Sequence, residues 1–331
     1  MHPREEAPVR WGIIGCGDVT EVKSGPALQN AAGSALVAIM RRDRAKAEDY
    51  ARRHAVPRAY GRVADLIGDP DVDAVYVATP PSTHLEIALQ VAAARKPCLV
   101  EKPMAMNYRE CARMIAAFHA SGVPLWVAYY RRALPRFLKV RELLSAGTIG
   151  LVTSLHVQVT DRLADEHTRR NWRFDPALAG AGLFLDLASH CFDLLDFLCG
   201  PIATVHGEAI NTARAYRAED VTAAVFRFES NVAGTGLWNF NADGKTDTIA
   251  FTGSHGTLVT PVFSDSDLVL VRGGEAPEMI HVRNPPHVHQ PLIQTIVDEL
   301  HGRGRCPSTG DSAARTSRVM DQCIAEYYRA R

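Results

Sequence analysis

Three side chains that can transfer or position a proton recur at helical spacing in one apolar segment, residues 183–195. Asp186, His190 and Asp193 are four and three residues apart, which places them on one narrow stripe of a helix. Because the segment is apolar on almost every side, the helix is expected to be buried. A buried carboxylate beside an imidazole orients the ring and favours its charged form. The pattern therefore predicts an acid–base site, with a purely structural Asp–His pair as the alternative.

A lysine follows a short apolar run that is typical of a buried parallel strand. Glu101-Lys102-Pro103 comes directly after Cys98-Leu99-Val100. An ammonium group at the end of such a strand is costly to desolvate and is hard to explain as packing. A positioned lysine suits proton transfer or the polarisation of a carbonyl group. A structural ion pair between Lys102 and Glu101 is the alternative.

Two glycines near the N-terminus have the spacing of a dinucleotide-binding turn. Gly15 and Gly17 follow the apolar run of residues 11–14 and precede Asp18 and Val19. In such turns the first glycine permits the tight bend, and the second lets the backbone approach a pyrophosphate at a helix N-terminus. Thr20 stands where the third glycine of the pattern is expected. An ordinary glycine turn between a strand and a helix is the alternative.

The end of the expected second strand bears on the choice of cofactor. NAD-selective folds carry an acidic residue there that binds the ribose 2′-hydroxyl, whereas this chain has Arg41 and Arg42. An arginine can hold a 2′-phosphate and stack on adenine. These residues therefore predict NADP. Asp43 follows immediately, so a shift of register by one residue would restore an acidic group and favour NAD. Two solvated arginines at a strand end are a third interpretation.

The segment Thr79-Pro80-Pro81-Ser82-Thr83-His84 closes another apolar run, residues 73–78. Its prolines form a rigid edge at the carboxyl end of a strand, where ligands bind in open parallel sheets. Contact with the cofactor and a simple capped turn are both compatible with it. The His287-Val288-His289 pair lies in a proline-rich loop without acidic or cysteine companions at ligand spacing, so no metal site is expected.

Strand and helix signals alternate in the first part of the chain and predict a doubly wound parallel sheet. After about residue 129, longer segments alternate apolar and polar residues, which is typical of an antiparallel sheet with one covered face. The domains expected are residues 1–128 (dinucleotide binding), 129–305 (an α+β domain with a large open sheet) and 306–331 (a helix packing back on the first domain). The expected strands are residues 9–14, 35–40, 73–78, 97–101, 124–128, 153–160, 203–211, 222–229, 233–240, 246–252 and 257–262. The expected helices are residues 44–54, 63–67, 84–94, 108–121, 135–145, 182–198, 291–301 and 311–329.

Composition excludes several classes of protein. The 331 residues contain 37 Lys and Arg against 37 Asp and Glu, so neither nucleic acid nor an anionic membrane is an expected partner. The polar N-terminus, residues 1–10, has no apolar run typical of a signal peptide, and no uncharged run is long enough to span a bilayer. The seven cysteines are scattered and never spaced C-x-x-C. Free thiols in a reducing cytoplasm are therefore expected.

Taken in order, G-x-G, T-P-P-x-x-H, E-K-P and D-x-x-x-H resemble the Gfo/Idh/MocA family of glucose-fructose oxidoreductases and inositol dehydrogenases. Pro307-Ser308-Thr309-Gly310 also resembles the C-terminal segment of that family. The resemblance implies a Rossmann domain, a mostly antiparallel sheet domain whose open face pairs subunits into a homodimer or homotetramer, and nicotinamide chemistry on sugars, polyols or their keto forms. Thr20 is a departure that puts only the tight packing of helix on sheet in doubt.

The resemblance also implies residue roles. Lys102 and His190 become the catalytic pair, and Asp186 binds substrate or assists His190. Pro80 and Glu101 line the nicotinamide side of the cofactor. Two further segments correspond to positions that often line the cleft in the family, with surface or packing roles as the alternative: Tyr130-Arg131-Arg132 and Asn171-Trp172-Arg173.

The expected activity is reversible NADP-dependent oxidation of a secondary alcohol, or reduction of a ketone, in a small sugar, inositol or related polyol. Dihydrodiol or xylose dehydrogenase-like activity and a redox-neutral NAD-dependent glycosidase are the enzymatic alternatives. A dinucleotide or sugar sensor without catalysis is the alternative outside the enzymes, although it has no need of Lys102, Asp186 and His190. Fold analogy alone does not decide among them.

Overall fold

The computed structural model describes residues 7–329 of the chain. The expectation that residues 1–10 do not form a signal peptide falls partly outside this range, because residues 1–6 are not described. Contacts divide the chain into two units. The first unit contains residues 7–105, Arg109–Leu134 and Pro285–Ala313, and the second contains Met106–Tyr108, Pro135–Asn284 and residues 314–329.

A six-stranded parallel sheet forms the core of the first unit, in the order β3-β2-β1-β4-β5-β6. This is the doubly wound order in which ligands bind at the carboxyl ends of the strands, where the winding reverses between β1 and β4. The predicted parallel sheet is confirmed. The strands are β1 (Val9–Ile14), β2 (Ser34–Met40), β3 (Arg58–Tyr60), β4 (Ala74–Val77), β5 (Cys98–Val100) and β6 (Leu125–Val127). The short strand β3 was not predicted, because three half-buried residues carry no periodic signal.

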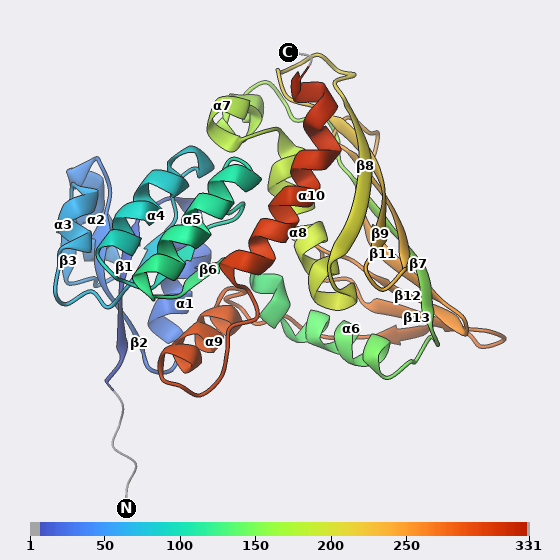
Figure 1. Cartoon of the computed structure of the whole chain (residues 1–331), viewed down its shortest axis with the longest axis horizontal. Coiled ribbons are helices and arrows are strands. Elements are labelled where there is room, and N and C mark those ends of the chain that lie inside the picture. The colour runs from blue at the N-terminus through green and yellow to red at the C-terminus, as the bar shows by residue number, and fades with distance from the viewer. Residues whose placement is uncertain (1–6, 330–331) are drawn as a thin grey trace, which may run out of the picture. The chain divides into compact units, whose positions relative to one another are not determined.

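Helices connect these strands (Figure 1). A wide turn of π-helix, η1 (Thr20–Ser24), precedes α1 (Gly25–Asn30), and 3-10 turns occur at η2 (Pro81–Thr83) and η3 (Tyr130–Ala133). The α-helices are α2 (Arg44–Arg53), α3 (Val63–Ile67), α4 (His84–Ala93), α5 (Tyr108–Ser121) and α9 (Gln290–Leu300). The chain returns to the first unit over Pro285–Ala313, where α9 contacts α1 and η3.

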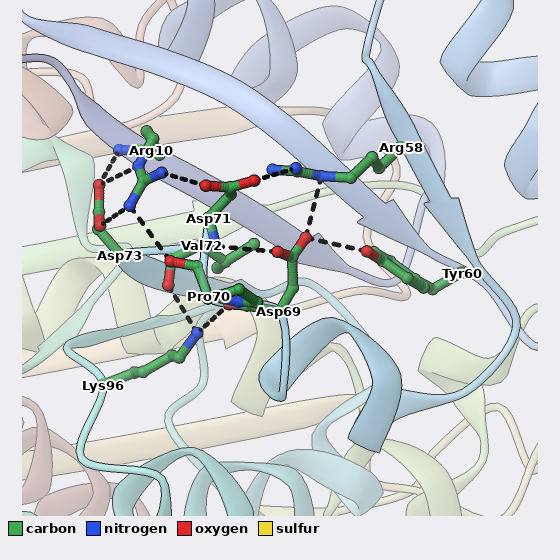
Figure 2. Close-up of polar contacts among 9 residues, drawn as sticks. All are labelled: Arg10, Arg58, Tyr60, Asp69, Pro70, Asp71, Val72, Asp73 and Lys96. Carbon is green, nitrogen blue, oxygen red and sulfur yellow. Dashed lines mark hydrogen bonds and ion pairs between the residues drawn. The ribbon is translucent and has the colours of Figure 1, made fainter.

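Charged side chains join the strands near the amino ends of β1 and β4 (Figure 2). Arg10 bonds to Asp71 and Asp73, and Arg58 pairs with Asp71 and Asp69. Lys96 donates to the backbone oxygens of Asp69 and Val72, at 2.6 Å each. Exposed pairs of this kind stabilise a fold only weakly one by one. As a network they tie β1, β3 and the loop before β4 at the edge opposite to the glycine turn.

The second unit is built on an eight-stranded sheet in the order β14-β13-β12-β11-β7-β10-β9-β8, in which only the β10–β7 pair is parallel. The predicted large, mostly antiparallel sheet is confirmed. Its strands are β7 (Val152–Thr160), β8 (Ile202–Ile210), β9 (Val221–Phe228), β10 (Ala233–Asn239), β11 (Thr246–Gly253), β12 (Gly256–Thr260), β13 (Leu268–Arg272) and β14 (Glu278–Ile280). The last two strands were not predicted.

Helices of the second unit lie on one face of this sheet (Figure 1). They are α6 (Pro135–Ser145), α7 (Pro176–Ala179), α8 (Leu183–Cys199) and α10 (Gly310–Arg329), with 3-10 turns η4 (Thr168–Arg170) and η5 (Trp172–Phe174). From Ala314 onward α10 belongs to the second unit. The packing of residues 306–331 on the first domain stays a prediction. By length and composition Pro176–Cys199 could cross a membrane, but 72% of its most apolar window is buried, as in a core helix.

Candidate functional site

The glycine turn after β1 has the two properties that a dinucleotide requires. Gly15 has φ +96°, and a Cβ there would lie 2.9 Å from the backbone oxygen of Ala78 and 2.7 Å from Cγ2 of Thr79. By contrast, a Cβ on Gly17 would find nothing within 4 Å. The first glycine is thus required by the fold, and the second leaves its backbone open to approach. This turn at the carboxyl end of β1 fits a bound pyrophosphate.

Thr20 is compatible with this turn because a later glycine replaces the missing one. Thr20 is fully buried, and its hydroxyl donates to the Gly17 backbone oxygen at 2.7 Å. Its own carbonyl accepts from the Tyr50 hydroxyl at 2.9 Å. A Cβ on Gly25 would overlap that carbonyl and the Tyr50 hydroxyl. Close packing is therefore provided by Gly25, which the sequence pattern did not reveal.

The structure gives each charged residue after β2 a distinct role. Arg41 donates from Nη1 to the backbone oxygen of Cys16, 2.9 Å away in the glycine turn. Asp43 caps α2 by accepting from the backbone N–H of Lys46, and this bond lowers the pKa of Asp43. Arg42 is exposed. Asp43 is thus committed to a helix cap, and the guanidinium of Arg41 lies beside the glycine turn.

His84 holds two of the sequence motifs together. Its Nε2 lies 2.7 Å from the Thr79 backbone oxygen, and its Nδ1 lies 3.1 and 3.2 Å from the backbone oxygens of Pro103 and Met104. The side chain is fully buried, and burial lowers its pKa. Both ring nitrogens therefore face backbone oxygens, which makes His84 the link between the T-P-P turn and the E-K-P turn. Its direct contact with a cofactor stays a prediction.

Glu101 organises the turn that carries Lys102. One carboxylate oxygen accepts from the Tyr76 hydroxyl, and the other accepts from the backbone N–H of Lys102 at 3.0 Å. Both Glu101 and Tyr76 are buried, and burial raises the pKa of Tyr76 well above its usual value. These bonds fix the backbone at Lys102, at the carboxyl end of β5.

His289, which the sequence analysis considered only as a metal ligand, lies beside Glu101 and Tyr130. Its Nδ1 lies 4.0 Å from the Glu101 carboxylate, and its ring stacks on Tyr130 with centroids 4.5 Å apart. The guanidinium of Arg131 lies over the Tyr130 ring, with its Cζ 4.9 Å from the ring centre. No group of three or more potential metal ligands occurs among residues 7–329. A histidine just before a helix, in a proline-rich loop, gave no signal of this position.

The acid–base stripe lies on α8 as the periodicity predicted. His190 is 5% and Asp193 1% exposed, and the His190 ring meets Phe263 edge-on at 6.1 Å. Arg173 Nε lies 3.4 Å from the Asp186 carboxylate. The guanidinium of Arg173 stacks over Trp172, with its Cζ 4.6 Å from the ring centre. The structure therefore brings together Trp172, Arg173 and Asp186, three residues that the sequence could connect only through resemblance.

Comparisons with known proteins agree with this architecture. Residues 9–129 match the model of the oxidoreductase family with an NAD-binding Rossmann fold, and residues 137–259 match the GFO/IDH/MocA C-terminal domain. The chain belongs to the Gfo/Idh/MocA family. It is similar to "Oxidoreductase P35" of Formosa agariphila, with 36% identity over 96% of this chain and 98% of that protein.

Other similar proteins share less sequence with this chain. The trans-1,2-dihydrobenzene-1,2-diol dehydrogenase of Bos taurus is 27% identical over 79% of this chain and 77% of its own length. The solved structure of a levoglucosan dehydrogenase in complex with NADH and levoglucosan shares the fold, with a TM-score of 0.87, 20% identity and 98% coverage of both chains. The chain is thus an NAD(P)-dependent oxidoreductase that uses a nicotinamide cofactor.

The pKa of His289 is lowered to about 3 by burial and then by the charges of Lys23, Arg131 and Lys102. The unfolded chain binds a proton there below about pH 6.5, whereas the folded chain does not. Acidification therefore favours unfolding by about 1.4 kcal/mol per pH unit below that point. Urea unfolding at about pH 7 and about pH 5.5 should show a smaller loss of stability in His289→Phe, which keeps the stack on Tyr130.

The exposed His255, between β11 and β12, provides the control for this experiment. His255→Gln should change the difference in unfolding free energy between the two pH values less than His289→Phe does. An unchanged difference in His289→Phe would show that His289 is not the group responsible.

Proposed function

We propose that the protein is an NADP(H)-dependent oxidoreductase that transfers a hydride between the cofactor and a secondary alcohol or ketone of a sugar or related polyol. The observation that carries the proposal is the ordered set of a fitting glycine turn, a braced Lys102 and a buried helix with Asp186 and His190. The levoglucosan dehydrogenase and the 1,5-anhydro-D-fructose reductase among the similar proteins support the substrate class.

The residues of the chain have the following roles in this proposal. His190 takes the hydroxyl proton of the alcohol, and Lys102 donates a hydrogen bond to the substrate oxygen as negative charge develops there. Asp186 orients His190 or a neighbouring hydroxyl. Gly15, Gly17, Asp18, Val19, Thr79 and Pro80 hold the cofactor. When bound, the nicotinamide supplies the hydride acceptor or donor.

The test follows absorbance at 340 nm with purified protein in both directions, with NADP⁺ or NAD⁺ and a panel of aldoses, inositols, anhydrosugars and polyols, and with NADPH or NADH and a panel of keto-sugars. Turnover that is stronger with NADP⁺ is expected. The dihydrodiol dehydrogenases of animals are also similar to this chain, so trans-dihydrodiols belong in the panel as the second candidate substrates. No change in absorbance with any alcohol or any keto-sugar would contradict the proposal and favour a sensor or a redox-neutral reaction.

Arg41 supports the choice of NADP, and its substitution is expected to change the cofactor preference. Loss of one hydrogen bond to a charged group costs about 1.5–3 kcal/mol, or about 10–150-fold. Arg41→Asp should therefore lower the ratio of kcat/KM for NADP⁺ over NAD⁺ by that factor. Because Arg41 also bonds to Cys16 in the glycine turn, both cofactors can bind more weakly, and only the ratio reports the 2′-phosphate.

Arg44→Asp is the matched control, since Arg44 is exposed in the first turn of α2. It should change the ratio by a smaller factor than Arg41→Asp. An unaltered ratio in Arg41→Asp would refute the assignment of the 2′-phosphate to this residue.

Self-association through the open face of the eight-stranded sheet is the proposal for the quaternary structure. One register row on that face contains His206, Val225, Thr235, His156 and Ala250, which are aligned across β8, β9, β10, β7 and β11. Val225 is 54% exposed. A row without acidic residues, lysine or arginine suits a dimer or tetramer interface. Sedimentation velocity should give a dimer or tetramer, and a monomer at micromolar concentration would contradict it.

A reducing cytoplasm is the proposed location. All seven cysteines are free, and burial raises the pKa of several of them, including Cys16 and Cys306 to about 12. Buried neutral thiols of this kind are typical of intracellular proteins. Cell fractionation tests this proposal, and recovery of the protein outside the cytoplasmic fraction would contradict it.

A further inference from the structure

Two anchors join the C-terminal helix α10 to the helix that carries the acid–base stripe. Near the start of α10, Arg315 donates to both carboxylate oxygens of Asp196, at 2.7 and 2.8 Å. Near its end, the Tyr328 hydroxyl donates to Glu219 Oε2 at 2.6 Å, and Glu219 Oε1 accepts from the backbone N–H of Gly182 at 3.0 Å. Asp196 lies in the last turn of α8, and Gly182 is its N-cap.

The spacing of the anchors matches between the two helices. At the rise of an α-helix, Arg315 and Tyr328 are about 20 Å apart along α10, and Gly182 and Asp196 are about 21 Å apart along α8. The early residue of α10 meets the late residue of α8, so the pair is antiparallel, and Figure 1 shows the two helices on the same face of the sheet. Asp186, His190 and Asp193 lie between the anchors.

Glu219 supplies the cap that α8 lacks in its own sequence. Gly182 has no side chain to cap the helix, and a Cβ there would lie 2.9 Å from the backbone oxygen of Glu219 and 3.1 Å from its Oε1. Glu219 is fully buried, and burial raises its pKa. A carboxylate is stabilised at a helix N-terminus by the exposed N–H groups and the helix dipole. The glycine is thus what lets Glu219 reach the first turn of α8.

The sheet also holds α10 closely, at Cys323. A Cβ on Gly207 of β8 would lie 2.5 Å from Cα and 2.6 Å from the backbone oxygen of Cys323, which is a buried residue of α10. The helix therefore packs against the backbone of β8, and it cannot shift toward the sheet to follow a displaced α8.

We propose that Tyr328, Glu219 and Arg315 are positioning residues that fix α8 along its axis and so place Asp186 and His190 for the reaction. The part that concerns catalysis rests on the proposed function. Loss of the Tyr328 hydroxyl frees the first turn of α8, and a displacement of catalytic groups by about 1 Å can lower a rate by about 100-fold.

The test compares Tyr328→Phe with Tyr327→Phe, since Tyr327 is the adjacent residue and its hydroxyl donates to the Arg217 backbone oxygen instead. Amide hydrogen exchange of residues 183–190 is measured in both variants. Exchange there should be at least about 10-fold faster in Tyr328→Phe than in Tyr327→Phe, because one hydrogen bond to a charged group is lost. Equal exchange in the two variants would overturn the proposal, whatever the enzyme acts on.

Kinetics then test the link to catalysis. Tyr328→Phe should lower kcat about 10-fold and leave the Kd of the cofactor unchanged, and it should add little to the loss caused by His190→Ala in the double variant. Full additivity would overturn the positioning role, whereas normal turnover in His190→Ala alone would overturn the proposed function.

Glu219→Gln, which keeps an acceptor for Gly182, should retain more activity than Glu219→Ala, and equal losses in these two would also contradict the proposal.

Discussion

His190→Ala is expected to lower turnover by about 100- to 10,000-fold, the contribution that a positioned acid–base group makes to a rate. The ring is buried on α8 beside Phe263, so its loss removes a proton acceptor that water does not replace in the same place. The Kd of the cofactor should change little, because the proposed cofactor residues belong to other segments of the chain. Steady-state kinetics with the best substrate and a fluorescence titration with NADPH measure the two quantities.

Two comparisons make this result specific. His255→Ala removes an exposed histidine from the turn between β11 and β12 and should leave turnover unchanged. Lys102→Ala should lower turnover by the same order as His190→Ala, because both groups are proposed to act on the substrate oxygen. Turnover close to that of the wild type in His190→Ala and Lys102→Ala, with both variants folded, would show that the reaction does not use this pair.

Much of the fold was predictable because its elements carry strong local signals. The buried strand β4 is a continuous apolar run, β1 is apolar except for Arg10, and β9 is rich in the β-branched and aromatic residues that are typical of strands. Of the strands that were not predicted, β3 and β14 have three residues each and lie at the edges of their sheets, whereas β13 is a five-residue run, LVLVR, that was overlooked. Pairing with a neighbour, rather than composition, makes the two edge segments strands.

The candidate site was predictable where the chemistry lies within one motif. Asp186 and His190 share a helix face, and Gly15 and Gly17 share a turn, so spacing alone indicates both. The contacts of His289 with Tyr130 and of Glu219 with Gly182 join residues far apart in the chain. No local pattern encodes such contacts, because they depend on how whole elements pack. Gly25, which takes over the packing role of the missing third glycine, was overlooked for the same reason.

Gly17→Val should raise the Kd of NADPH by about 150-fold or more while the folded state keeps its stability. A Cβ on Gly17 would find no protein atom within 4 Å, and a side chain there occupies the position from which a pyrophosphate approaches the backbone. Loss of even one charge-assisted bond of the strong kind, together with the steric conflict, costs about 3 kcal/mol or more. Fluorescence titration measures the affinity, and thermal unfolding without cofactor measures the stability.

Gly15→Ala is the informative counterpart, because the two glycines are two residues apart and meet opposite surroundings. At φ +96° an alanine is strained, and its methyl group would lie 2.9 Å from the rigid backbone oxygen of Ala78. This variant should therefore lose both stability and cofactor affinity, whereas Gly17→Val loses affinity alone. If Gly17→Val instead bound NADPH as tightly as the wild type, the pyrophosphate would not lie over this turn. The cofactor site would then have to be sought at another edge of the parallel sheet.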